Sequence, residues 1–354
     1  MAYLTALTST LALLATSVRA APAPSRFSFY TLPTPESGPC DMVEGHDGML
    51  YIQNFLVDTL VRLDPSTGVT TEYQIPYNNP PAATSVLPGL GNRTALACAI
   101  RPGDDGLIYA ASGVRNEIVQ LDPATGMVKV FAQPANDPLG DLQPFNDMWP
   151  GPTGMFFSQT TGNVISLFNY DSHTFQNYPV PTPLSGPLGM RLASDGALWF
   201  TEFIAQKIGR LNYTSGSITE YPIPTLDLSL LGPAVLRVEE DPYLYFTGFV
   251  GDGIGRIDIH SGEIDSFPYT VPAAFPAEDT QDPKGNVWFS TATQNTIQYL
   301  TPSTGKFTTI PLPDTVVAEP GLLPNAQIGI TYGPGNAIWF AELSMNRIGR
   351  YALS

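Results

Sequence analysis

The chain has 354 residues, of which 43% are hydrophobic and only 14% charged, and its formal net charge is −16. Because a chain this acidic repels phosphate backbones, we expect no nucleic-acid partner. Its 32 glycines and 35 prolines are spread among aromatic and β-branched runs, which favours many short strands over disorder.

The first twenty residues, MAYLTALTSTLALLATSVRA, combine an apolar run with a small-residue end. This pattern predicts a secretory signal peptide (1–20) that is cut after Ala20 and leaves one domain, 21–354. A membrane anchor is the alternative, but the run is too short and too polar to span a bilayer. We therefore expect a secreted protein with no membrane association after cleavage. Asn92 and Asn212 begin Asn-X-Thr triplets and are predicted glycosylation sites.

A short motif of a tight turn followed by an aromatic strand recurs along the chain at intervals of 43 to 58 residues. Its seven copies are DGMLYI (47–52), DGLIYA (105–110), PTGMFF (152–157), DGALWF (195–200), DPYLYF (241–246), KGNVWF (284–289) and GNAIWF (335–340). A repeat of this length is typical of a β-propeller, in which each repeat forms a blade of four short strands.

The fourth copy shows the repeating unit most completely. We expect an innermost strand within 186–194, an Asp195-Gly196 hairpin turn, and further strands within 197–202, 207–213 and 217–224. The sequence thus predicts an all-β protein in which the repeated motif is scaffold and function depends on residues that differ between copies.

The last copy lacks a fourth strand, whereas residues 27–35, FSFYTLPTP, resemble the outer-strand segments of other copies. We expect this N-terminal strand to pair with the last blade and close a seven-bladed ring, because closure removes exposed sheet edges. A six-bladed ring is the alternative, since the third copy, PTGMFF, is divergent.

The segments GPLGMRLASDGALWFTE, KIGRLNYTSGSITEYPIP and IWFAELSMNRIGR resemble repeats of the virginiamycin B lyase (streptogramin lyase) family. The resemblance covers nearly the whole chain after residue 20 and implies a seven-bladed propeller. It also implies an enzyme that opens a cyclic depsipeptide by elimination across an ester bond. In that family glutamates hold a Mg²⁺ ion and a histidine accepts the proton.

The family's catalytic Glu-Pro-His-Gly-Ile run corresponds here to residues 326–330, so that Ala326 and Ile328 stand for the glutamate and the histidine. A second family histidine corresponds to Ala277, and a tyrosine corresponds to Cys40. Glu342 matches the acid that ends the second strand of the last blade. The resemblance therefore predicts the fold, while the residues argue against the bacterial lyase chemistry.

Histidine chemistry is not expected elsewhere either. His46, His173 and His260 precede or occupy predicted turns, where we expect them to be solvated. None falls on an innermost strand, which disfavours a histidine base or a histidine-bound metal in the channel.

Four acids fall where one end of a propeller channel converges, at innermost-strand starts or second-strand ends. We predict Glu342, Glu202 and Asp41 as catalytic candidates. Glu342 and Glu278 are candidate ligands for Mg²⁺ or Ca²⁺, which prefer carboxylate oxygens. The alternative is that these acids are solvated or bonded to loop amides.

Arg101, Arg191 and Arg237 fall at positions that the motif alignment makes equivalent. Three guanidinium groups at one level of a channel would bind a substrate, with Phe145 and Trp149 in its apolar wall. The alternative is that each arginine pairs with an acid or a carbonyl of a neighbouring blade.

Cys40 and Cys98 are the two cysteines, and they occupy equivalent positions in the first two copies. In an exported protein this arrangement predicts a disulfide between neighbouring blades. A nucleophilic thiol is the less favoured alternative.

Three functional hypotheses follow from these residues. The first is a secreted, monomeric enzyme of the lyase or cyclase type that acts on a small apolar molecule such as a natural product. The second is a secreted binding propeller without catalysis. The third is a lactonase-type hydrolase with a carboxylate-held metal.

Overall fold

The structure is a computed structural model, and it describes residues 25–77, 95, 97–133, 146–224, 226–313 and 326–354. The predicted signal peptide, Asn92 and Phe145 lie outside these residues. Within them, no helix is long and apolar enough to span a lipid bilayer.

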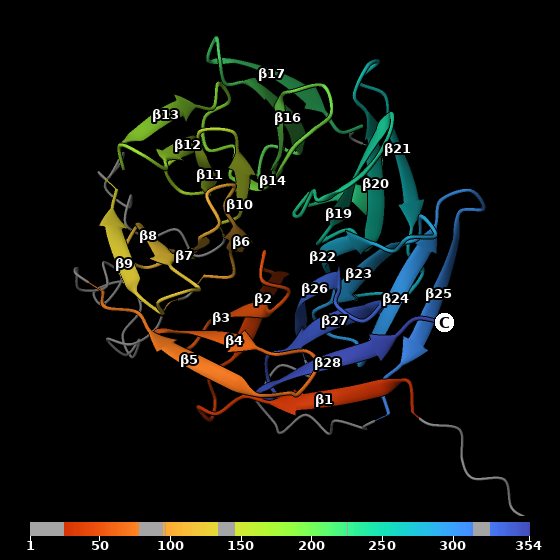
Figure 1. The fold of residues 1–354 in the computed structure, drawn as a ribbon. Helices are drawn as coiled ribbons and strands as arrows, with labels where there is room; N and C mark the ends of the chain where they lie inside the picture. The colour runs from red at the N-terminus through yellow and green to blue at the C-terminus, as the bar shows by residue number, and fades with distance from the viewer. Residues whose placement is uncertain (1–24, 78–94, 96, 134–145, 225, 314–325) are drawn as a thin grey trace, which may run out of the picture.

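Seven four-stranded antiparallel sheets are arranged as blades in a ring around a central axis (Figure 1). Each blade is built in chain order from an innermost to an outermost strand, except that β1 supplies the outermost strand of blade 7. A seven-bladed β-propeller is therefore confirmed, and the six-bladed alternative is wrong.

The strands of blades 1 to 3 are β2 (Pro39–Glu44), β3 (Leu50–Asn54), β4 (Thr59–Leu63), β5 (Thr70–Gln74); β6 (Ile100–Pro102), β7 (Ile108–Ser112), β8 (Glu117–Leu121), β9 (Val128–Ala132); and β10 (Met148–Gly151), β11 (Gly154–Gln159), β12 (Val164–Asn169), β13 (Phe175–Pro179).

The strands of blades 4 and 5 are β14 (Pro187–Leu192), β15 (Leu198–Glu202), β16 (Lys207–Asn212), β17 (Ser217–Pro222); and β18 (Val238–Glu240), β19 (Tyr243–Gly248), β20 (Gly253–Asp258), β21 (Ile264–Pro268), with the 3-10 helix η2 (Leu228–Leu230) in the connection between them.

The strands of blades 6 and 7 are β22 (Pro276–Gln281), β23 (Val287–Thr291), β24 (Thr296–Thr301), β25 (Lys306–Pro311); and β26 (Gln327–Gly333), β27 (Ala337–Glu342), β28 (Arg347–Ala352), β1 (Phe27–Thr31).

Ring closure follows the predicted route, because β1 pairs antiparallel with β28 from Phe27↔Tyr351 to Thr31↔Arg347. A second contact secures the same joint. The Asn346 side chain accepts hydrogen bonds from Ser37 N and Oγ at 2.8 and 2.7 Å and donates one to Thr34 O at 2.9 Å. The N-terminal segment is thus held to blade 7 by both a strand and a side-chain contact.

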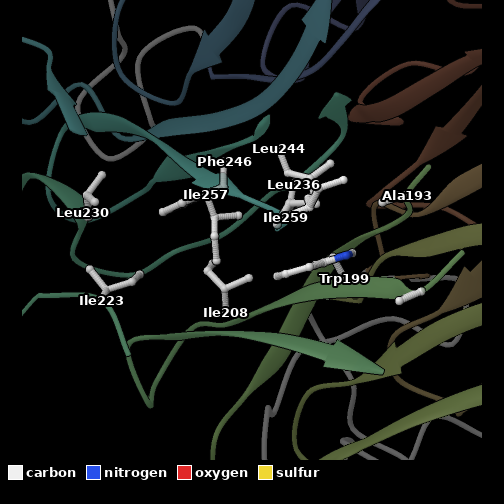
Figure 2. Packing of buried hydrophobic residues seen from close by; sticks show 11 residues of the cluster. Ala193, Trp199, Ile208, Ile223, Leu230, Leu236, Leu244, Phe246, Ile257 and Ile259 are labelled. Carbon is white, nitrogen blue, oxygen red and sulfur yellow. The ribbon is translucent and has the colours of Figure 1, made fainter. Parts of the chain in front are cut away.

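The hydrophobic core consists of seven clusters, each lying between two neighbouring blades. Figure 2 shows the cluster between blades 4 and 5, where Trp199 and Ile208 of blade 4 face Phe246 and Ile257 of blade 5. Every blade therefore buries both of its faces against its two neighbours.

The repeated motif is scaffold in the blades where its turn begins with Asp-Gly. Asp195 accepts a hydrogen bond at 3.2 Å from the indole N–H of buried Trp199, four residues later. Asp47 and Asp105 accept equivalent bonds from Tyr51 and Tyr109 at 3.0 and 2.6 Å. The glycine after each aspartate has a positive φ, 75° at Gly196, which a tight hairpin requires. The carboxylate of each turn is therefore used to hold its own hairpin.

The predicted disulfide joins Cys40 on β2 to Cys98, two residues before β6, with the Cα atoms 5.2 Å apart. This spacing lies within the usual range for disulfides. Blades 1 and 2 are thus linked covalently beside the channel.

The predicted equivalence of the three arginines is wrong for one of them. Arg101 and Arg191 lie opposite Tyr109 and Trp199, the repeated aromatic residues of their blades. In blade 5 the residue opposite the repeated aromatic Tyr245 is Val238, so that Arg237 lies one position nearer the start of its strand.

Candidate functional site

We call the two ends of the ring the entry face, where the innermost strands begin, and the hairpin face, where the turns between first and second strands lie. The entry face is marked by Cys40, Ala277 and Ile328, and the hairpin face by turns such as Asp195-Gly196. Because each blade repeats the same strand order, its innermost strand runs from the entry face to the hairpin face.

A network of ion pairs fills the middle of the channel. Arg237 contacts Glu278 at 2.6 Å, Asp147 at 2.8 Å and Asp41 at 3.2 Å. Arg101 contacts the same Asp41 at 2.9 Å and Asp147 at 3.4 Å. The five residues come from blades 1, 2, 3, 5 and 6, so the network ties most of the ring together across its axis.

Burial and these neighbours set the charges of the network. Burial acts to raise the pKa of Asp41, but Arg101 and Arg237 outweigh it and hold that pKa below the ordinary value. Burial raises the pKa of Glu278 well above its ordinary value, although Arg237 opposes the shift. The arginines thus favour the ionised form of Asp41, whereas burial favours the protonated form of Glu278.

Arg191, the third predicted arginine, pairs with a different acid from the other two. Arg191 Nε contacts Glu239 at 3.0 Å, and its guanidinium group donates to the Arg237 carbonyl. Each of the three predicted arginines is thus paired with a carboxylate. This is the arrangement expected of structural cross-links between blades rather than of free anion-binding groups.

A cavity of about 320 Å³ adjoins the network. Its lining includes all three arginines, Glu239, Asp279 and a mostly apolar remainder: Met42, Val43, Pro102, Trp149, Pro150, Val238, Thr280, Gln281, Ile330 and Thr331. Most of these residues lie in the second half of their innermost strands, so the cavity lies toward the hairpin face.

Trp149 forms the aromatic wall of this cavity. Its ring lies 5.0 Å from the guanidinium carbon of Arg191 and 6.0 Å from that of Arg101. Such cation–π contacts fix the orientation of both arginines and leave an apolar surface beside them. The predicted binding residues Arg101, Arg191, Arg237 and Trp149 are therefore brought together in one place.

Asp279, which the sequence reasoning did not single out, is the most perturbed group on the cavity wall. Its side chain is buried, and neither carboxyl oxygen accepts a well-aligned hydrogen bond from the described residues, although the backbone N–H of Arg237 acts on the carboxyl. Burial raises the pKa of Asp279 to about 8, although the positive charges of Arg237 and Arg191 act to lower it. The available signal was two consecutive acids, Glu278-Asp279, on an innermost strand, where a strand places them on opposite faces.

Two of the predicted catalytic acids lie at the other end of the channel. Glu202 and Glu342 end β15 and β27 and are both buried. Glu342 is bound by Arg347. Glu202 faces Lys207 in the strand register, but Lys207 contacts Glu220 at 2.8 Å instead. Burial and the charge of Glu220 raise the pKa of Glu202 to about 7.

The entry face also carries the positions that correspond to the family's catalytic run. Gln327 is paired with Glu342 in blade 7, as Pro187 is paired with Glu202 in blade 4. Gln327 is the first residue of β26, so Ile328 lies one residue after the start of this strand. Ala277 takes the same place in blade 6. The side chains of Ile328 and Ala277, at the positions of the family's histidines, cannot accept a proton.

The family's Mg²⁺ does not fit the described residues. Among the ranges that the structure describes, no group of three His, Cys, Asp or Glu side chains is placed to hold a metal ion. Glu342 and Glu278, predicted as ligands, are each bound to an arginine. Ala326 at the glutamate position offers no donor.

The three histidines lie in exposed turns, as expected: His46 between the innermost and second strands of blade 1, and His173 and His260 between third and fourth strands. His46 contacts Gly103 O at 2.9 Å, and His173 stacks on Phe168. His260 is exposed in the turn between β20 and β21. Asn212, the predicted glycosylation site in the described part, is exposed at the end of β16.

Comparisons with known proteins agree with this architecture. The family model described as the Virginiamycin B lyase family matches residues 89–320. The chain belongs to this family. No curated protein sequence shows significant similarity to it.

Solved structures of the virginiamycin B lyase family superpose over nearly the full chain. A streptogramin B lyase is 26% identical with a TM-score of 0.76, covering 92% of this chain and 96% of that one. Virginiamycin B lyase from Staphylococcus aureus is 27% identical with a TM-score of 0.77, covering 93% and 99%. A catalytically inactive histidine-to-alanine variant of that enzyme, with quinupristin, is 26% identical with a TM-score of 0.76, again covering 93% and 99%.

Proposed function

We propose that this virginiamycin B lyase family member is a secreted, lyase-type enzyme that acts on an uncharged, largely apolar small molecule. Its substrate binds in the cavity at the hairpin end of the channel. Family membership supports elimination chemistry, and the cavity supports a small-molecule substrate.

Charge balance in and beside the cavity is the observation that carries the proposal. Arg101, Arg191 and Arg237 are offset by the carboxylates Asp41, Asp147 and Glu239. With each arginine matched by a carboxylate, a site walled by Trp149 and aliphatic residues suits a neutral ester or lactone better than an anion.

Lyase chemistry in this cavity uses its polar wall. Guanidinium N–H groups of the lining arginines stabilise charge that develops on the substrate carbonyl oxygen. Glu239, the lining carboxylate whose pKa Arg191 and Ser194 help to keep low, accepts the proton from the carbon next to that carbonyl. The deprotonated carbon lies between that activating carbonyl and the carbon that bears the ester oxygen. The C–H electrons form a C=C bond between these two carbons, the alkyl C–O bond of the ester breaks, and the carboxylate leaves with the bonding pair without water.

Mass spectrometry after incubation with a panel of uncharged lactones and cyclic depsipeptides tests this function. Elimination opens a cyclic ester into a product of unchanged mass with a new double bond, whereas hydrolysis adds the mass of one water. We expect the first result, lost in Glu239→Gln and Trp149→Ala and retained in the exposed control Asp104→Asn. Added water in the product, or no turnover of any panel member, contradicts the proposal.

A non-catalytic binding propeller is the second candidate, because the ion pairs of Arg101 and Arg237 close the middle of the channel. It is supported if panel members bind and are returned unchanged. A metal-dependent hydrolase is not supported, because no three His, Cys, Asp or Glu side chains among the described residues are placed to hold a metal ion.

We also propose that the protein is secreted and that it is a monomer. The Cys40–Cys98 disulfide is typical of proteins from oxidising compartments. We expect secreted material to begin after Ala20, to carry glycan on Asn212 and to elute as a monomer, which intact-mass analysis and size-exclusion chromatography measure. Retention of residues 1–20 in secreted protein contradicts the predicted cleavage.

A further inference from the structure

A second cavity, of about 280 Å³, lies between blades 6 and 7. It opens on the hairpin face, because its lining includes Asn286 from the turn between β22 and β23, Asn336 from the turn between β26 and β27, and Ser354 after β28. We call it the rim cavity. It shares no lining residue with the central cavity, so a ligand bound there occupies a separate site.

The way the ring closes accounts for the rim cavity. In five blades the glycine of the turn between third and fourth strands lies over a ring from the preceding blade, as at Gly262, where an added Cβ would lie 2.5 Å from Tyr221. Blade 7 has no such turn, because its fourth strand, β1, comes from the other end of the chain. In blade 6 the residue at the position of Tyr221 is Ile310, which lines the cavity. The rim cavity therefore lies where other blades are covered by a turn.

The walls of the rim cavity are apolar and largely aromatic. Tyr299, Ile310 and Leu353 are half-buried and line it, with the buried rings of Trp288 and Tyr351 beside them. The Trp288 ring centre lies 4.6 Å from that of Tyr299 and 6.0 Å from that of Tyr351. Walls of this kind favour a flat, apolar ligand that can pack against aromatic rings.

Arg26 supplies a positive charge whose orientation is fixed. Its guanidinium carbon lies 4.3 Å from the centre of the Tyr351 ring, and its Nε donates to Ala352 O at 2.8 Å. Its two Nη groups make no hydrogen bond or ion pair within the described part of the chain, and the residue is exposed and lines the cavity. The two Nη groups of an arginine match the two oxygens of a carboxylate.

The remaining charged side chains of the lining do not cancel this charge. Lys284 is a second cation, and its Nζ donates to the Ser354 main-chain oxygen at 3.2 Å. Asp282 accepts hydrogen bonds from the Lys284 backbone N–H at 2.8 Å and from Asn286 Nδ2 and Trp288 Nε1 at 2.9 Å each. The Asp282 carboxylate thus holds its own hairpin, while Arg26 stays available to an anion.

We propose that the rim cavity binds an aromatic carboxylate. The ring of the ligand packs against Tyr299 and Ile310, and its carboxylate accepts hydrogen bonds from the Nη groups of Arg26. This site goes beyond the proposed function, which concerns uncharged molecules in the central cavity, and does not depend on it.

Titration calorimetry with 2-naphthoate at pH 7 tests the proposal. The neutral amide 2-naphthamide has the same two rings without the charge, and acetate has the carboxylate without the rings. We expect 2-naphthoate to bind the native protein about tenfold more tightly than either comparison compound, because it makes both the ring contacts and the charged hydrogen bonds.

Variants of the lining locate the bound ligand. Arg26→Gln is expected to lower the affinity for 2-naphthoate about tenfold and to leave that for 2-naphthamide unchanged. Tyr299→Ala is expected to weaken both. In the matched control Arg256→Gln, the arginine lies 4.1 Å from the Tyr243 ring but is paired with Asp265 at 2.9 Å, so that 2-naphthoate affinity is expected to stay the same.

The outcomes separate the rim cavity from the central one. Binding of 2-naphthoate that is lost in Trp149→Ala but unaffected by Arg26→Gln and Tyr299→Ala places the ligand in the central cavity and overturns the proposal. Equal affinity for 2-naphthoate and 2-naphthamide overturns the role of Arg26, and failure of 2-naphthoate to bind overturns the site. The elimination reaction is measured with uncharged esters and with Glu239 and Trp149 variants, so neither result decides the other.

Discussion

Replacing Asp279 by asparagine is expected to stabilise the folded protein, and more so as the pH rises. In the unfolded chain the carboxyl ionises at about its ordinary pKa of 3.8, whereas in the folded protein burial raises the pKa to about 8. Between these values the folded state binds a proton that the unfolded state has released. Stability therefore falls as pH rises through this window, and the loss is complete above the folded pKa.

The magnitude follows from the two pKa values. Each unit of difference corresponds to about 1.4 kcal/mol, so the wild-type protein loses about 4 kcal/mol between pH 4 and 7 relative to a variant that cannot ionise. Asp279→Asn has nearly the same shape and no charge. The stability difference between variant and wild type is expected to grow by roughly 1.4 kcal/mol per pH unit and to level off above pH 8.

Urea unfolding followed by tryptophan fluorescence at several pH values and constant ionic strength measures this difference. Asp104→Asn removes one exposed carboxylate and provides the background for lowering the net negative charge. A difference between Asp279→Asn and wild type that does not change with pH refutes the reasoning. An asparagine variant that is less stable at every pH indicates instead an ionised Asp279 that is paired with the neighbouring arginines.

Three further predictions concern other parts of the ring. Glu342→Gln is expected to lower the free energy of unfolding by about 2 kcal/mol, measured with urea, because it leaves Arg347 without its buried acid; unchanged stability contradicts the importance of this pair. Replacing Cys40 and Cys98 by serine is expected to cost about 4 kcal/mol for a sequence separation of 58 residues, and a thermal midpoint equal to wild type contradicts it. Purified protein with Mg²⁺ is expected to leave virginiamycin B closed in a chromatographic assay, whereas Mg²⁺-dependent ring opening that Glu342→Ala abolishes shows the last blade to be misaligned.

The propeller was predictable because its determinants are local and repeated. An Asp-Gly turn with an aromatic residue four positions after the aspartate recurs in blades 1, 2 and 4, and a glycine in the third strand recurs in blades 4, 5 and 7. Each has a local reason: at Gly209 an added Cβ would lie 2.2 Å from the ring of Phe200. The disulfide was predictable for the same reason, since equivalent positions in adjacent blades are neighbours.

The ion pairs and protonation states of the channel residues were harder to predict from the sequence, because these residues meet only when the ring is complete. Arg237 lies one position away from the level that the motif alignment predicts, and this shift lets it reach Asp41, Asp147 and Glu278 together. The neutral state of Asp279 results from burial among blades far apart in sequence. Neither residue carries a local signature of its pairing or of its protonation state.

Closure by β1 and β28 has a consequence for biosynthesis. The first strand of the ring leaves the ribosome early, but its partner is the last strand to be made, and contacts such as Arg26 Nε to Ala352 O span 326 residues. During synthesis β1 lacks its partner strand, and the face of blade 1 that packs on blade 7 is uncovered. Unpaired strands and exposed apolar faces favour aggregation. Each nascent chain must therefore stay unassociated until β28 has been synthesised, and we expect dependence on chaperones to be greatest at this joint.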